Sequence, residues 1–110
     1  MRRLAGFGSL ILLAVSLSAF SAETWKGKIS DKMCGADHKG HDAVACVKNC
    51  VKGGSPYVFV VGTDKVLDIE NQKDARIAAS LDKFAGKSVT VTGTMSKDGK
   101  SVTIASIKGE

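Results

Sequence analysis

The chain has 110 residues, of which 44% are hydrophobic and 25% are charged, and its formal net charge is +5 at pH 7. This balance is that of one ordinary globular domain, so it excludes a multidomain enzyme, a polytopic membrane protein and a disordered or fibrous chain. The sixteen Lys and Arg residues are interleaved with eleven acids, whereas nucleic-acid binding needs a dense basic stripe with stacking aromatics, so we expect no nucleic-acid partner.

The N-terminal segment has the pattern of a secretory signal peptide. Two arginines near the start precede a strongly apolar run over residues 10–17, and small residues follow that run. A positive start, a short apolar stretch and a small-residue end are typical of a signal that is cleaved on export. We expect removal of residues 1–21, by cleavage after Ser21 or Ala22, and a periplasmic or secreted mature chain. An uncleaved segment would instead anchor the protein in the membrane.

Residues 22–110 are expected to form a single domain that opens with a strand over residues 24–30. Gly, Asp, Lys and His without apolar periodicity predict a loop over residues 31–41. An aspartate cap, a valine stripe and a terminal glycine then indicate a helix over residues 43–52. Together they form a predicted loop–helix insertion over residues 31–53, in which all the cysteines and histidines of the chain lie.

Two strands in a hairpin follow, over residues 57–61 and 65–69, because β-branched and aromatic residues flank a Gly-Thr-Asp turn. A second amphipathic helix is predicted over residues 74–85, and a glycine ends it. Two strands with period-two alternation, over residues 88–92 and 101–104, are separated by an Asp-Gly turn. The domain is therefore expected to be mainly β with two short helices.

The predicted order, five short strands with a helix between the third and the fourth, is that of an OB-fold. The alternation of Val and Thr indicates strands with one buried and one solvated face, as in a small antiparallel barrel. We therefore expect a five-stranded OB-fold-like antiparallel barrel, and an open α+β sheet is the alternative architecture. Trp25, in the first strand, is expected to be a core or rim aromatic.

The cysteines and histidines form a cluster that indicates chemistry. Cys34, His38, His41, Cys46 and Cys50 lie within seventeen residues, with the spacing C-x3-H-x2-H-x4-C-x3-C. Cys46 and Cys50 are four residues apart on one face of the predicted helix, so their thiolates can chelate one ion. Cys34 and a histidine of the preceding loop would complete a tetrahedral site. Sulfur and imidazole ligands favour Zn²⁺ or Cu⁺, so zinc or copper is the candidate cofactor.

A disulfide is the alternative, because export to an oxidising compartment favours pairing of cysteines. Side chains four residues apart on a helix have Cβ atoms about 5–6 Å apart, whereas a disulfide needs about 3.8 Å. A bridge from Cys34 to one helical cysteine is easier, and it would leave one free thiol in a stapled structural or interaction domain. A thiol redox protein is the third possibility, although the C-x-x-C spacing of thioredoxin-like proteins is absent.

An enzyme is not expected. Asp37 and His38 lie near Cys34 in the sequence, but such proximity does not make a catalytic triad, and no other residues indicate an oxyanion hole. Two neighbours of the cluster have weaker candidate roles. Met33 would offer a thioether to a Cu⁺ site, and Asp31 would either cap the loop or accept a hydrogen bond from a ligating histidine.

Three motifs occur in order, namely D-x-x-C-G-x-x-H at residues 31–38, C-x-x-x-C at residues 46–50 and G-K-x-V-x-V-x-G at residues 86–93. Together they resemble an uncharacterised family of small exported bacterial proteins with an OB-fold-like domain. The resemblance covers nearly all of the mature chain and implies no particular activity. It implies that the site positions are Cys34, His38, Cys46 and Cys50, and that His38 rather than His41 completes the site, because His41 lies outside the first motif.

The sequence as a whole predicts a small exported binding module that holds a zinc or copper ion through a Cys3His cluster. The stapled domain with one free thiol and the thiol redox protein remain the alternatives. The expected partner is the metal ion, or else an unidentified protein or small molecule.

Overall fold

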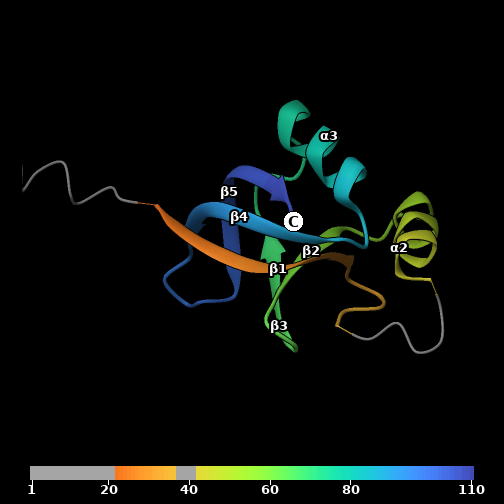
Figure 1. The fold of residues 1–110 in the computed structure, drawn as a ribbon, viewed down its shortest axis with the longest axis horizontal. Coiled ribbons are helices and arrows are strands. Elements are labelled where there is room, and N and C mark those ends of the chain that lie inside the picture. Colours follow the sequence, from red (N-terminus) through yellow and green to blue (C-terminus); the bar gives the residue numbers. More distant parts are fainter. Residues whose placement is uncertain (1–21, 37–41) are drawn as a thin grey trace, which may run out of the picture.

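A computed structural model describes residues 22–36 and 42–110, which form five strands and two helices (Figure 1). The expected signal peptide, residues 1–21, lies outside the described residues. In chain order the elements are β1 (Glu23–Asp31), α2 (Ala43–Lys52), β2 (Tyr57–Val61), β3 (Lys65–Ile69), α3 (Ala75–Phe84), β4 (Ser88–Met95) and β5 (Ser101–Gly109). Within the described ranges, neither helix has the length and apolar character needed to cross a membrane.

The five strands form a closed sheet in the order β1-β2-β3-β5-β4, with β4 paired again to β1. Four of the neighbouring pairs are antiparallel, but β3 and β5 run parallel, with Asp68 opposite Ser101 and Ile69 opposite Val102. The sheet is therefore mixed, and the prediction of a wholly antiparallel sheet is wrong at this pair. The chain crosses over through α3 before the β4–β5 hairpin, so β5 returns in the direction of β3. Because the sheet closes, the open α+β alternative is also wrong.

The side chain of Asn71 extends the short junction between β3 and β5. Its amide nitrogen donates to the Ile104 carbonyl oxygen at 2.7 Å, and its Oδ1 accepts from the Ile104 N–H at 2.9 Å. These two bonds continue the backbone pairing beyond the end of β3, since the Glu70 N–H already donates to the Val102 carbonyl at 2.9 Å. An amide side chain thus takes the place of a strand residue, because it offers one donor and one acceptor as the backbone does.

Strand β1 closes the sheet because it pairs with two strands. Its first part, Glu23 to Lys28, pairs with β4, and its second part, Gly27 to Asp31, pairs with β2. Gly27 pairs with both, and a Cβ atom there would lie 2.1 Å from the Val60 carbonyl oxygen. The close crossing therefore requires glycine, and it directs the last residues of β1 toward α2 (Figure 1).

The two strands of the last hairpin, β4 and β5, are longer than predicted. They continue to Met95 and Gly109, and their register shifts between Thr92 and Gly93. A Cβ atom at Gly93 would lie 2.2 Å from the Thr103 carbonyl oxygen, so the strands approach most closely at this irregularity. The bulge interrupts the Val/Thr alternation, which is why the pattern predicted the strands to end early.

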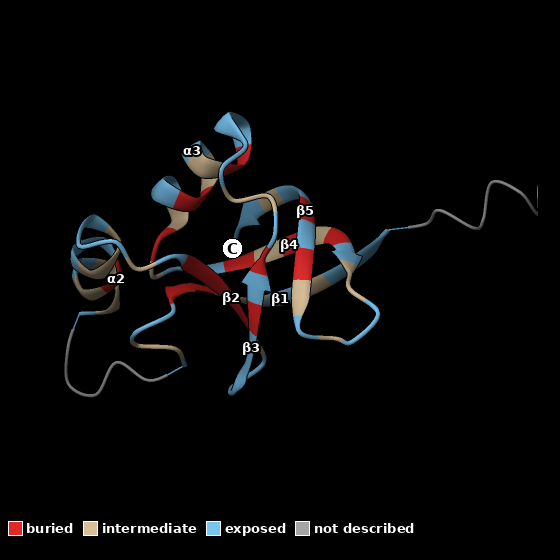
Figure 2. Ribbon diagram, turned by 180° about the vertical axis from the view of Figure 1, so that it is seen from behind, coloured by how far each residue is buried: buried red, intermediate tan, exposed pale blue. Residues whose placement is uncertain are grey.

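The core lies inside the closed sheet and under the two helices (Figure 2). Val47 of α2 and Ile77 and Leu81 of α3 are buried against it, as the helical spacing predicts. Trp25 is partly buried at the rim, as expected. The largest fully buried side chains of the strands are Phe59, Ile29, Leu67, Val58, Val89, Val91 and Val102.

The segment after α3 fixes the position of α2 on the sheet. The Gly86 N–H donates to the Ile29 carbonyl at 2.8 Å, and the Ile29 N–H donates to the Lys87 carbonyl at 3.2 Å. Gly86 has φ +77°, and a Cβ atom there would lie 2.6 Å from both the backbone nitrogen and the Cα of Val44. The first turn of α2 therefore packs directly on this glycine. The helix itself spans the predicted residues, and the Asp42 side chain caps it by accepting from the Val44 N–H at 2.9 Å.

Candidate metal centre

Three thiols meet between the end of β1 and helix α2. The Cys34 Sγ lies 3.0 Å from the Cys46 Sγ and 3.8 Å from the Cys50 Sγ, and all three sulfurs lie within 4.8 Å of one another. Each of the three cysteines is half-buried. The structure thus brings together three of the four predicted site residues, from two elements that are separated in the sequence.

A tight turn after β1 positions Cys34. The Asp31 Oδ2 accepts from the backbone N–H groups of Met33, at 3.0 Å, and Cys34, at 3.2 Å. The Gly35 N–H donates to the Asp31 carbonyl at 2.8 Å, and the left-handed φ of +60° at Gly35 completes the turn. Asp31 therefore caps this turn, which is one of the two roles that the sequence suggested. The aspartate and the glycine of the 31–38 motif both serve to present the cysteine between them.

Helix α2 supplies the other two thiols. Cys46 and Cys50 lie one turn apart on the same face, which follows from their spacing of four residues. Their face points toward the turn that carries Cys34, because Val47 and Val51 hold the helix against the core. The predicted chelating pair is therefore presented by a helix whose position is set by burial of its valines.

Ser55 links the helix to the turn. Its backbone N–H donates to the Cys50 carbonyl at 3.0 Å. Its hydroxyl lies 3.3 Å from the Asp31 Oδ2, to which it donates, and 3.3 Å from the Met33 N–H, from which it accepts. Sequence reasoning missed this residue, because a serine in a Gly-Gly-Ser-Pro connection reads as an ordinary loop residue.

Asp31 is the most unusual charged group of the site. The residue has no solvent exposure, and its Oδ1 is buried without a hydrogen-bond partner among residues 22–36 and 42–110. The carboxylate forms no ion pair with a lysine or arginine in those ranges. It interacts instead with the thiols of Cys34 and Cys50. Because burial of an unpaired carboxylate is costly, a cation at the thiols would be favoured by its charge.

The surroundings keep two of the thiols protonated in the absence of a metal. The pKa of Cys34 is raised far above its usual value, mainly by the hydrogen bond with the Cys46 thiol and then by burial. Burial also raises the pKa of Cys50; the Asp31 charge adds to this rise, and the hydrogen bond with Cys34 opposes it. Neither thiol has the lowered pKa that activates a catalytic cysteine.

The sulfur positions are compatible with a bound metal ion, and no two of them are joined in a disulfide. No pair lies at bonding distance, since the shortest separation is 3.0 Å and an S–S bond is about 2.05 Å long. In a tetrahedral site with Zn–S bonds of about 2.3 Å, the sulfurs lie about 3.8 Å apart. The separation of Cys34 and Cys50 has that value, and the separation of Cys34 and Cys46, at 3.0 Å, is shorter by about 0.8 Å.

The helix cysteines can be reached from outside. A shallow depression of about 280 Å³ lies on the outer side of α2, and its lining residues include Cys46, Cys50 and the capping Asp42. Cys34 does not line it. This depression therefore gives solvent one route to the thiols of the helix.

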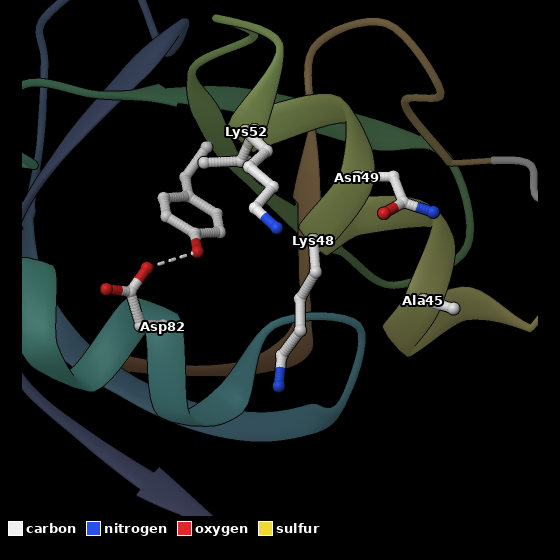
Figure 3. A pocket seen from close by; sticks show the side chains of 7 residues that line it. Ala45, Lys48, Asn49, Lys52 and Asp82 are labelled. Atoms are coloured by element: carbon white, nitrogen blue, oxygen red, sulfur yellow. Dashed lines mark hydrogen bonds between the residues drawn. The ribbon is translucent and has the colours of Figure 1, made fainter.

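A larger pocket of about 520 Å³ lies on another side of α2 and involves no cysteine (Figure 3). In it the Tyr57 hydroxyl donates to the Asp82 Oδ1 at 2.5 Å, and the Lys48 and Lys52 side chains extend along the wall formed by α2 (Figure 3). The pKa of Tyr57 is raised by burial and by the neighbouring Asp82 carboxylate. This hydrogen bond joins β2 to α3 and has no connection with the thiols.

The remaining predicted ligand is not placed. His38 lies outside the described residues, as do His41 and Asp37. Met33 is described and is 80% exposed.

Within residues 22–36 and 42–110, the group of cysteine, histidine and acidic residues close enough to hold one metal ion is Cys34, Cys46 and Cys50. Comparisons of the chain with known protein families, with curated proteins and with solved structures found no match, so a function has to be argued from this group itself.

Proposed function

We propose that the protein is a small exported binding module that holds one soft metal ion, Zn²⁺ or Cu⁺, through Cys34, Cys46 and Cys50. His38, four residues after Cys34, would supply the fourth ligand of a Cys3His site. Thiolate and imidazole donors favour these ions over Mg²⁺ and Ca²⁺. The proposal is a binding role and not a catalytic one.

The observation that carries the proposal is the meeting of three thiols beside a buried carboxylate. Three cysteines from two elements lie within 4.8 Å of one another, and Asp31 leaves one oxygen buried without a partner in the described ranges. A bound cation would give the carboxylate a counter-charge and would replace three protons on the sulfurs. The counter-charge favours metal binding, whereas the loss of the thiol protons opposes it and makes the affinity rise with pH.

We also propose that the domain is an OB-fold and that it belongs to the family of exported bacterial proteins which the three motifs resemble. The strand order β1-β2-β3-β5-β4, with α3 between β3 and β4, supports the OB-fold. In this arrangement the loop–helix insertion between β1 and β2 carries the site. Export with removal of residues 1–21 is part of the same proposal.

The test is the mass of the exported protein, measured under native conditions and again after denaturation with thiol alkylation. We expect the native mass to exceed the denatured mass by one zinc or copper ion, and three alkyl groups to be added. A native mass without metal, combined with one alkylation, would overturn the proposal in favour of the stapled domain with a spare thiol. The same spectra give the mature N-terminus.

Asp31→Asn is expected to lower the affinity for Zn²⁺ about 10- to 100-fold. The amide oxygen of the asparagine can still accept the hydrogen bonds of the turn. The substitution removes the negative charge that faces the thiols. Zinc affinity measured by competition with a chromophoric chelator checks this result.

The matched control for this change is Asp68→Asn, which removes an exposed carboxylate that pairs with Lys32 at 3.2 Å. It is expected to leave zinc affinity unchanged, since surface ion pairs contribute little. Equal affinities for the wild type and the Asp31→Asn variant, with both folded by circular dichroism, would show that the buried charge has no part in binding.

A further inference from the structure

We propose that the same three cysteines carry out thiol–disulfide exchange with external disulfides, with Cys46 as the attacking thiol and Cys34 as the resolving thiol. The substrate class is a disulfide small enough to enter the depression beside α2, such as a low-molecular-weight disulfide or an exposed disulfide of another protein. The effect of this exchange on the metal rests on the proposed function.

The geometry makes Cys34 the shared partner of both helix cysteines. Its Sγ lies 3.0 Å from that of Cys46 and 3.8 Å from that of Cys50. A shift of about 1 Å brings the closer pair to bonding distance. Cys34 lies in a short turn after β1 and not within a helix or strand, so such a shift requires no change in the sheet.

The two helix cysteines are poorly placed to form a disulfide with each other. Cys46 and Cys50 are one turn apart, and side chains at that spacing in a regular helix have Cβ atoms about 5–6 Å apart, which exceeds the separation of about 3.8 Å that a disulfide needs. Among the described residues, the hydrogen bonds between sulfurs are those of Cys34 with Cys46 and of Cys34 with Cys50. A disulfide therefore forms through Cys34, with Cys46 favoured by its shorter distance.

The depression beside α2 favours a helix cysteine as the first thiol to react, although all three cysteines are half-buried. Cys46 and Cys50 line the depression of about 280 Å³ beside α2, whereas Cys34 does not. Attack in line on a disulfide needs an approach from the open side, which the helix cysteines have. Of these two, Cys46 lies nearer to Cys34. A mixed disulfide on Cys46 is therefore the one that Cys34 can attack with the smaller movement.

The reaction balances with the external disulfide as the oxidant. The Cys46 thiolate attacks one sulfur of the external disulfide, the external S–S bond breaks, and one external thiol leaves with the proton that Cys46 lost. In the mixed disulfide Cys46 has no thiol proton to share with Cys34. Cys34 then loses its proton as it attacks the Cys46 sulfur, and the second external thiol leaves with that proton. Two protein thiols are oxidised by two electrons, one external disulfide is reduced to two thiols, and Cys50 remains a thiol.

This exchange would control the metal site. The Cys34–Cys46 bond removes two of the three sulfur ligands, so a bound ion would be released on oxidation. Reduction of the bond would restore the site. Conversely, a bound ion would occupy the thiolates and slow the exchange.

The experiment uses the reduced protein, stripped of metal with a chelator and then treated with oxidised glutathione. Samples are quenched by alkylation and weighed intact. The wild type is expected to lose two hydrogens and to accept one alkyl group, with the bond mapped to Cys34 and Cys46 by peptide mass. Cys34→Ser is expected to stop at the mixed disulfide, with an internal bond formed at least about tenfold more slowly.

Two further variants serve as matched controls. Cys50→Ser is expected to form the internal bond at the wild-type rate and to accept no alkyl group. Cys46→Ser is expected to form the Cys34–Cys50 bond more slowly. An internal bond in Cys34→Ser at the wild-type rate, or a wild type that accumulates the mixed disulfide, would overturn the proposal.

A second arm separates this proposal from the proposed function. The protein is first incubated with Zn²⁺, and released zinc is followed with a chromophoric chelator during oxidation. Release of one zinc per internal bond supports the control of the metal site. Failure to bind zinc, with the internal bond still formed in the metal-free arm, would overturn the metal proposal and leave the exchange standing. Zinc binding without formation of the internal bond would overturn the exchange proposal and leave the metal proposal standing.

Discussion

Replacement of Cys34 by serine is expected to weaken the binding of Zn²⁺ by roughly a hundred- to a thousandfold. Structural zinc sites bind with about 10–16 kcal/mol shared among four ligands, so the loss of one ligand costs about 2.5–4 kcal/mol. Cys34 is the proposed ligand that joins the turn after β1 to α2, because its sulfur lies within hydrogen-bonding distance of both helix thiols. Titration of the reduced protein in competition with a chromophoric chelator measures the change.

The control for this prediction is the neighbouring Met33→Ala. Met33 lies in the same turn and is 80% exposed, so its loss is expected to leave zinc affinity and stability unchanged. The same variant tested with Cu⁺ under reducing conditions examines the thioether role that the sequence suggested. A Cys34→Ser protein that binds zinc as tightly as the wild type would rule out a site built on the three cysteines.

Replacement of Gly86 by alanine is expected to lower the free energy of unfolding by about 3–4 kcal/mol. A left-handed residue other than glycine costs about 1–2 kcal/mol, and the new Cβ would lie 2.6 Å from the backbone of Val44. Overpacking against backbone that cannot move away adds about 1–3 kcal/mol. Urea unfolding followed by circular dichroism measures the loss, which is a large part of the stability of a small domain.

Gly62→Ala is the matched control, because Gly62 also has a positive φ, of +66°, but a Cβ atom there would meet nothing within 4 Å. It is expected to cost only about 1–2 kcal/mol. The difference between the two variants isolates the contact between Gly86 and α2. Because that contact seats the helix, Gly86→Ala is also expected to weaken zinc binding, and Gly62→Ala is not. Equal losses of stability in the two variants would show that the helix does not rest on Gly86.

Local patterns predicted the elements well, since each depends on near neighbours. The Asp42 cap and the valine spacing predicted α2 over the residues that it spans, and the turn at residues 62–64 predicted the β2–β3 hairpin. The spacing of Cys46 and Cys50 likewise predicted a shared helix face. The meeting of Cys34 with this pair followed as an expectation from metal chemistry, and the structure places the three sulfurs together.

Features that depend on distant contacts were not predictable in the same way. The parallel pairing of β3 and β5 is set by how the chain crosses over through α3, which no local alternation encodes. The bulge at Gly93 depends on the approach of Thr103 from the other strand. Ser55 contributes to the site only because folding brings it to Asp31, and the unpartnered oxygen of Asp31 is a consequence of burial that a sequence does not display.

The attachment of Cys34 to the end of β1 has a consequence for the lifetime of the protein. Asp31, which holds the Cys34 turn, is paired with Tyr57 of β2, so the third sulfur reaches the helix pair only after the strands have found their register. An ion that needs all three sulfurs would therefore bind the native chain and not the unfolded one. At a free concentration 100 times its Kd, it would add about 2.7 kcal/mol and make exposure to proteases about a hundredfold rarer. The supply of metal would then set how long each molecule survives.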